Sequence, residues 1–122
     1  WGYNHGMVLV NHDGEVLWTY DDITEGAYPT HAHLIDWDGG GELYAVLGEQ
    51  PGPEQKKWPL KIVLINHEGK EVLRVPFQDW RVPEWQYNYE NSAAVADVDG
   101  EGLEELVFPT CKGTLMIVDR KQ

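Results

Sequence analysis

The feature that most constrains this chain is an internal repeat, because a repeated unit fixes the architecture of a fold before any single residue does. An apolar run, an Asn-His-acid-Gly turn and a second apolar run occupy residues 7–17 and return at residues 62–73. Residues 115–119 echo the start of this unit a third time. A second unit, built around an Asp-x-Asp-Gly turn, occupies residues 33–43 and returns at residues 94–106. The two kinds of unit therefore alternate along the chain.

Each unit has the pattern of a β-hairpin, in which turn residues join two apolar runs. The first runs of both copies, residues 7–10 and 62–65, are apolar without alternation, which predicts strands buried on both faces, as in a sheet stacked between two others. Six Trp, six Tyr and thirteen Gly, against two Phe and two Met, favour strands and tight turns. No segment has the pattern of a long amphipathic helix. The predicted fold class is all-β.

Two successive hairpins make a four-stranded module about 55 to 61 residues long, counted from Asn11 to Asn66 and from Asp36 to Asp97. Four-stranded antiparallel sheets repeated around an axis are the blades of a β-propeller. With strands named A to D from the axis outward, the pattern predicts strands C and D at residues 7–20, a complete blade at 31–76, and strands A, B and C of a third blade at 92–119.

These nine strands amount to about two blades, which cannot close a ring by themselves. We therefore expect the chain to associate with the remainder of a larger propeller or with copies of itself. A small sandwich or barrel is the structural alternative.

The formal net charge of −12 argues against partners that carry negative charge. It repels nucleic acid phosphates and anionic membrane surfaces, and the nine Lys and Arg residues form no basic cluster. No apolar run approaches the roughly 20 residues of a membrane span. We expect neither nucleic acid nor membrane as a partner. The acidic balance fits either a protein that binds divalent cations or an ordinary solvated surface.

The Asp-Val-Asp-Gly-Glu-Gly-Leu-Glu-Glu-Leu-Val run at residues 97–107 resembles the repeat of FG-GAP and VCBS-type β-propellers. The earlier unit preserves Asp36, Asp38, Gly39 and Gly41. Together with the Asn-x-x-Gly hairpins, the resemblance covers most of the chain. Similar blades build rhamnogalacturonan lyases and related secreted polysaccharide lyases, and also integrin-like and lectin-like propellers. The resemblance therefore implies a propeller and an extracellular or periplasmic location, and leaves the reaction open.

The loop that begins at Asp97 has the spacing of a calcium site, since Ca²⁺ takes six to eight oxygen ligands and alternate carboxylates can wrap around one ion. Gly100 permits the tight turn. The alternative is an acidic turn whose side chains bond only local amides. The predicted ligands of a structural Ca²⁺ are Asp97, Asp99, Glu101, the Leu103 carbonyl and Glu105.

The earlier copy of this loop is degenerate. Gly40 and Tyr44 stand where the second copy has glutamates, and the loop is expected to be about two residues shorter. The sequence therefore favours a structural turn at Asp36 and Asp38.

The long connections between strands, at residues 21–30, 48–59 and 77–91, are predicted to lie at the end of the sheets opposite the acidic turns. They hold much of the aromatic content, and aromatic faces beside hydrogen-bonding groups suit sugar rings. The alternative is that these aromatics only pack the loops onto the sheets. The predicted sugar-binding residues are Trp80, Trp85, Tyr87, Tyr89 and Asn91.

A polysaccharide lyase needs a base to remove the proton beside a uronate carboxylate and a cation to neutralise that carboxylate. Residues of the required types are Tyr28, His31, His33 and Arg81. His31 and His33 share one face if residues 30–36 form a strand, so they could instead bind a metal with a third ligand, or serve as structural hydrogen-bonding groups.

Two functions from different classes follow from these patterns. The first is a carbohydrate-active propeller segment, with polysaccharide lyase chemistry as its enzymatic form. The second is a noncatalytic, calcium-braced binding or scaffolding module. Composition does not separate them.

Overall fold

The computed structural model describes residues 6–29, 32–51, 60–77, 94–109 and 115–120. These residues form ten β-strands and no helix, so none of them builds a helix that could cross a membrane. The predicted all-β class is confirmed. The strands are β1 (Met7–Val10), β2 (Val16–Tyr20), β3 (Ala27–Pro29), β4 (His33–Ile35), β5 (Tyr44–Pro51), β6 (Leu60–Ile65), β7 (Glu71–Phe77), β8 (Ala94–Ala96), β9 (Glu105–Pro109) and β10 (Leu115–Val118).

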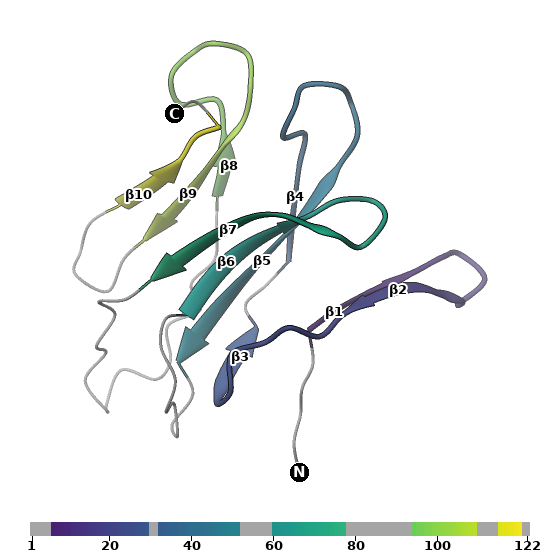
Figure 1. The fold of residues 1–122 in the computed structure, drawn as a ribbon. Helices are drawn as coiled ribbons and strands as arrows, with labels where there is room; N and C mark the ends of the chain where they lie inside the picture. Colours follow the sequence, from purple (N-terminus) through teal and green to yellow (C-terminus); the bar gives the residue numbers. More distant parts are fainter. Residues whose placement is uncertain (1–5, 30–31, 52–59, 78–93, 110–114, 121–122) are drawn as a thin grey trace.

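The strands are arranged in three antiparallel sheets (Figure 1). The first sheet is the β1–β2 hairpin. The central sheet runs in the order β4–β5–β6–β7, with β3 paired to the same edge of β5 as β4. The third sheet runs β8–β9–β10. In the part of the chain that the structure describes, these sheets close neither a barrel nor a ring.

The two Asn-containing hairpins repeat each other residue for residue. Val8 pairs with Thr19 as Val63 pairs with Arg74, and each hairpin has a β-bulge at the residue before its turn. The side-chain Oδ1 of the turn Asn accepts hydrogen bonds from the amides two and four residues later, at 2.9 to 3.0 Å in both turns. The predicted hairpins at residues 7–17 and 62–73 are thus confirmed.

One edge of the central sheet holds a strand, β3, that was not predicted from the sequence. β5 is eight residues long but β4 covers only three of them, and β3 pairs with three more. The pairing register shifts by one residue between Pro29–Glu49 and His33–Val46. Residues 21–30 were expected to be a loop, and nine strands were expected. This was wrong because the unpaired backbone groups of β5 are satisfied by a second short strand, which contains Tyr28.

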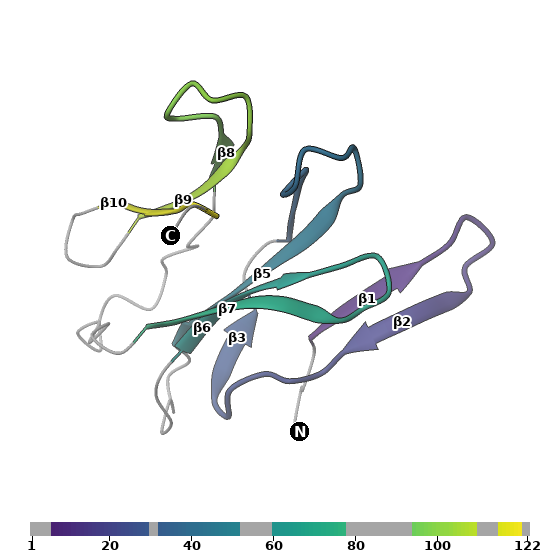
Figure 2. The ribbon, with the colours of Figure 1, turned by 45° about the horizontal axis from the view of Figure 1, so that its top comes forward.

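The central sheet is buried on both faces, because the first hairpin packs on one and the third sheet on the other (Figure 2). Alternate residues of β6 face opposite ways: Ile62 and Leu64 belong to the core shared with the third sheet, and Val63 and Ile65 to the core shared with the first hairpin. Burial on both faces is confirmed for β6. It is wrong for β1, where Val8, Leu9 and Val10 are exposed because none of the described sheets covers the outer face of the first hairpin.

The turns of the β1–β2, β4–β5, β6–β7 and β8–β9 hairpins lie at one end of the molecule (Figure 1). The indole Nε1 of Trp18, in β2, donates to the carbonyl of His67 in the β6–β7 turn at 3.1 Å. The His67 imidazole lies 2.5 Å from Glu42 in the β4–β5 loop. The strand ends at Pro51, Leu60 and Phe77 point to the opposite end. The hairpin turns therefore line one end of the sheets, and these strand ends lie at the other; the predicted position of the connections at residues 52–59 and 78–91 lies outside the described residues.

Candidate functional site

The two acidic loops have the same length and position in their sheets. Ile35 pairs with Tyr44 across the first loop, and Ala96 pairs with Glu105 across the second, so residues 36–43 and 97–104 are equivalent. The expected shortening of the first loop by about two residues is wrong. The repeat spacing of 61 residues is kept on both sides of the loop, from His33 and Ala94 to Val46 and Val107.

Both loops are shaped by Asp side chains that accept hydrogen bonds from loop amides. Asp36 Oδ2 accepts from the amide of Gly41 at 3.0 Å, and Asp97 Oδ2 accepts from the amide of Gly102 at 2.8 Å. Two glycines in each loop adopt positive φ angles between 74° and 82°, which residues with a side chain adopt only with strain. The turn therefore takes this shape through its own Asp and Gly residues.

The second loop also gathers three carboxylates. Oxygen atoms of Asp97, Asp99 and Glu105 lie within 4.8 Å of one another. Glu105 is buried, and its Oε2 accepts a hydrogen bond from the amide of Val98 at 2.8 Å. Among the described residues, Asp97 and Glu105 form no ion pair with a Lys or Arg. A divalent cation at this position would offset the mutual repulsion of the three groups.

The first loop replaces the third carboxylate with a phenol. Tyr44 occupies the place of Glu105, and its hydroxyl donates to Asp38 Oδ2 at 3.1 Å. Two hydrogen-bond donors lower the pKa of the Asp38 carboxyl: the backbone amide of Gly40 has the larger effect, and the Tyr44 hydroxyl the smaller. The first loop therefore stabilises its own carboxylate with hydrogen-bond donors, which is the structural turn that the sequence favours.

The five predicted calcium ligands are brought together in part. Asp97, Asp99 and Glu105 form the group of three, and Glu101 is not among its members. A ligand role for the Leu103 carbonyl stays a prediction. Carboxylate oxygens of this kind suit Ca²⁺, and the remaining coordination positions would have to be filled by carbonyls or water.

Most of the predicted sugar-binding and catalytic residues lie outside the described residues: His31, Trp80, Arg81, Trp85, Tyr87, Tyr89 and Asn91. Two candidates can be placed. Tyr28 is exposed on β3, opposite Gln50 of β5. His33 is half-buried on β4, and its Nε2 is buried without a hydrogen-bond partner among the described residues.

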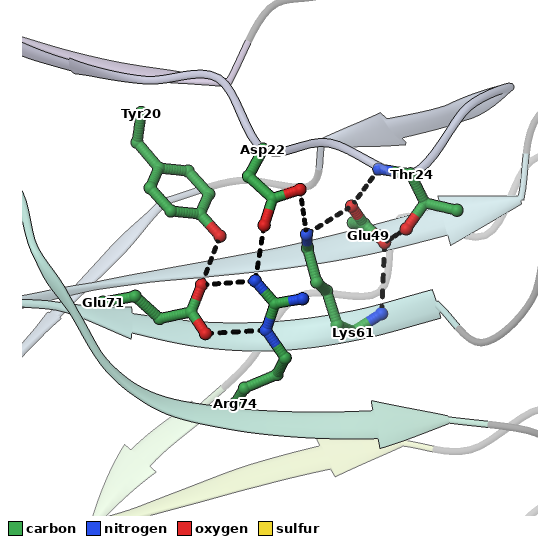
Figure 3. A network of polar contacts seen from close by, with 7 residues as sticks. All are labelled: Tyr20, Asp22, Thr24, Glu49, Lys61, Glu71 and Arg74. Atoms are coloured by element: carbon green, nitrogen blue, oxygen red, sulfur yellow. Dashed lines mark hydrogen bonds and ion pairs between the residues drawn. The ribbon is translucent and has the colours of Figure 1, made fainter.

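A polar network that sequence reasoning missed joins the β2–β3 connection to the central sheet (Figure 3). Its centre is Glu49, a buried residue of β5 whose carboxylate accepts from the amide and hydroxyl of Thr24, both at 2.6 Å, and from the amide of Lys61 at 3.1 Å. The buried Lys61 extends its Nζ to within 3.1 Å of Asp22. The sequence signal that could have indicated the network is a pair of charged residues near the ends of largely apolar strands, Glu49 in β5 and Lys61 in β6.

The second half of the network is built around Arg74 of β7. Its guanidinium contacts Asp22 at 2.5 Å and Glu71 at 2.6 and 2.7 Å, and Glu71 also accepts from the Tyr20 hydroxyl at 2.7 Å. Hydrogen bonds from Arg74 lower the pKa of both Asp22 and Glu71. Burial, and then the bond to Glu71, raise the pKa of Tyr20. Since each of these groups is already bonded to a neighbour, the network suits a structural role.

Comparison of the chain with protein-family models, curated proteins and solved structures finds no match.

Proposed function

We propose that this chain is a noncatalytic scaffolding segment of a β-propeller, with its second acidic loop braced by calcium. Two observations support the interpretation as a propeller. The strands repeat in the order expected for blades, and the sheets stack face to face through apolar cores. The FG-GAP-type spacing of the acidic loops adds to this.

The group formed by Asp97, Asp99 and Glu105 is the single observation that carries the calcium part. The first loop supplies an internal comparison, because the same backbone turn there has a phenol in place of the third carboxylate. An ion bound at the second loop would hold the start of β9 against the end of β8. This loop lies at the end of the sheets opposite the strand ends at Pro51, Leu60 and Phe77, so the ion would stabilise the hairpin and take no part in chemistry.

The calcium proposal is tested by thermal unfolding of the whole chain in chelator and in saturating calcium. We expect calcium to raise the melting temperature by roughly 5 to 15 °C, because a ligand that binds only the folded state stabilises it by mass action. In the Asp99→Asn variant this increment should disappear, since the amide keeps the local hydrogen bond but loses the charge.

The matched control is Asp38→Asn, which makes the same change in the first loop and should keep the full calcium increment. About 10 mM calcium exceeds the dissociation constants of even weak extracellular calcium sites. If the melting temperature of the wild-type chain is unchanged at this concentration, the second loop is only an acidic turn.

Carbohydrate binding is the second candidate, with polysaccharide lyase chemistry in an extracellular or periplasmic protein as its enzymatic form. It is supported by the aromatic content of residues 80–91 and by the strand ends at Pro51, Leu60 and Phe77, from which the long connections leave the sheet at one end. Glycan binding that is lost in Trp85→Ala and Tyr87→Ala would support this candidate, and binding that both variants retain would contradict it. A lyase would also release a product with the ultraviolet absorbance of an unsaturated uronate.

A further inference from the structure

Both junctions between sheets are built in the same way. We call the face that a sheet turns toward the next sheet in the chain its leading face, and the face toward the previous sheet its trailing face. At the first junction, the leading face of the β1–β2 hairpin, with Trp18 and Tyr20, packs on the trailing face of the central sheet, with Leu47, Val63 and Ile65.

At the second junction the central sheet presents its leading face, with Val46, Ile62 and Leu64, to the trailing face of the third sheet, with Leu106 and Phe108. The equivalent residues follow from the pairing registers: Phe108 pairs with Met116 as Leu47 pairs with Val63. At both junctions, therefore, the leading face of one sheet packs on the trailing face of the next sheet, and equivalent repeat positions make the contact.

The first hairpin leaves its own trailing face uncovered. Val8 and Val10 are the equivalents of Val63 and Ile65, because the two hairpins share register and bulge. Val63 and Ile65 are 1% and 0% exposed, whereas Val8 and Val10 are 53% and 47% exposed. The same apolar positions are thus buried in the central sheet and open to solvent in the first.

The third sheet leaves its leading face uncovered. Leu115 and Ile117 are the equivalents of Ile62 and Leu64, since Ile117 pairs with Val107 as Leu64 pairs with Val46. Ile62 and Leu64 are 3% and 1% exposed, whereas Leu115 and Ile117 are 69% and 53% exposed. Among the described sheets, the first hairpin therefore has an exposed trailing face on one side of the stack, and the third sheet has an exposed leading face on the other (Figure 2).

We infer that these two faces are complementary and that a second copy of the chain docks on the first head to tail. In this contact, Leu115 and Ile117 of one copy pack on Val8 and Val10 of the other. The contact is heterologous, so it uses different surfaces on the two copies and leaves one face of each kind free for further copies. It repeats a junction that the chain already forms twice. The inference rests on the sheet registers and does not depend on calcium.

The test uses two double variants of the whole chain, each blocked on one face: Val8→Lys with Val10→Lys, and Leu115→Lys with Ile117→Lys. Analytical ultracentrifugation in chelator and in calcium should show concentration-dependent association of the wild-type chain. Each variant alone should be monomeric, and an equimolar mixture of the two should form a heterodimer through the one intact pair of faces.

A charge-matched control, Leu43→Lys with Val72→Lys, changes two exposed apolar residues outside both faces and should associate like the wild type. Circular dichroism of each variant checks that the strands are retained. The inference is overturned if the wild-type chain stays monomeric at several hundred micromolar, in which case other sheets of a larger propeller are the occupants of these faces. It is also overturned if either blocked variant still dimerises, since that result would mean that one face pairs with itself.

Discussion

At the scale of single residues, Glu105 and Tyr44 occupy equivalent places in two equivalent loops and differ in the chemistry they bring. Glu105 adds a third carboxylate to Asp97 and Asp99. Tyr44 adds a donor to Asp38. The residue at this one position thus distinguishes a loop that could bind a cation from a loop that is stabilised by its own hydrogen bonds.

This difference predicts a gain of function. Tyr44→Glu should give the first loop three carboxylates and, if the second loop binds calcium, raise the stoichiometry measured by calorimetric titration from about one ion per chain to about two. Tyr44→Phe removes the hydroxyl without adding charge and should leave the stoichiometry at one. A stoichiometry of one for Tyr44→Glu would mean that the first loop cannot form the site even with the third carboxylate.

Gly69 and Gly14 offer a second comparison of equivalent residues. Both adopt positive φ, 79° and 83°, so alanine at either position costs about 1–2 kcal/mol of backbone strain. A Cβ on Gly69 would also lie 2.7 Å from Cγ of Trp18, while one on Gly14 would meet nothing within 4 Å. We expect Gly69→Ala to destabilise the chain by about 1–3 kcal/mol more than Gly14→Ala. Urea unfolding measures both, and equal losses would show that Trp18 does not pack against this turn.

The candidate site was predictable only in part, and the reason lies at this scale. The alternate spacing of Asp97 and Asp99 in the sequence indicated the loop, because side chains two residues apart can share one ion. The degeneracy of the first loop was also visible, through Tyr44. The equal length of the two loops was not, since it depends on which residues pair across them.

At the scale of elements, the polar network fastens the β2–β3 connection to three strands of the central sheet. Its groups come from sequence positions up to 52 residues apart, as Arg74 and Asp22 are. Sequence reasoning could recognise Glu49 and Lys61 as charged residues in apolar strands. It could not assign their partners, because these depend on the neighbours that each strand acquires on folding.

The network predicts how stability depends on pH. Bonds from Arg74 hold the pKa of Asp22 and Glu71 below their ordinary values of 3.8 and 4.5. Their contribution is therefore fully present above those values and is lost as the pH falls through the lowered values in the folded state. The free energy of unfolding should decline below about pH 5, and Asp22→Asn with Glu71→Gln should make this decline shallower.

Denaturant unfolding at a series of pH values measures the effect. A control that removes one Asp and one Glu from the exposed β1–β2 turn, Asp13→Asn with Glu15→Gln, should keep the wild-type decline. Identical acid profiles for the network variant and the wild type would mean that solvent screens these surface charges almost completely.

The strands themselves were predictable to different degrees. The apolar run of β6 and the Asn-x-x-Gly turns fixed both hairpins, because local turn chemistry and side-chain alternation determine them. β3 was not predictable: three residues that include Pro29 carry no strand pattern, and they pair only because the edge of β5 is left open beyond β4.

At the scale of the whole molecule, net charge opposes the head-to-tail contact. Two copies that each carry a formal charge of −12 repel each other, and added salt screens this repulsion while leaving apolar burial in place. Association of the wild-type chain should therefore tighten between roughly 0.02 and 0.5 M sodium chloride. Sedimentation at both salt concentrations measures it, and association that weakens with salt would indicate a contact made by ion pairs instead of the apolar faces.

The double burial of the central sheet also bears on how the chain reaches its folded state. β4 to β7 are consecutive and pair with their sequence neighbours, so this sheet can assemble early. Until the first hairpin and the third sheet arrive, however, Val63 and Leu64 face water on opposite sides. Folding of the three sheets should therefore be cooperative. A proteolytic cut that releases either outer sheet would expose an apolar face of the central sheet and promote its aggregation.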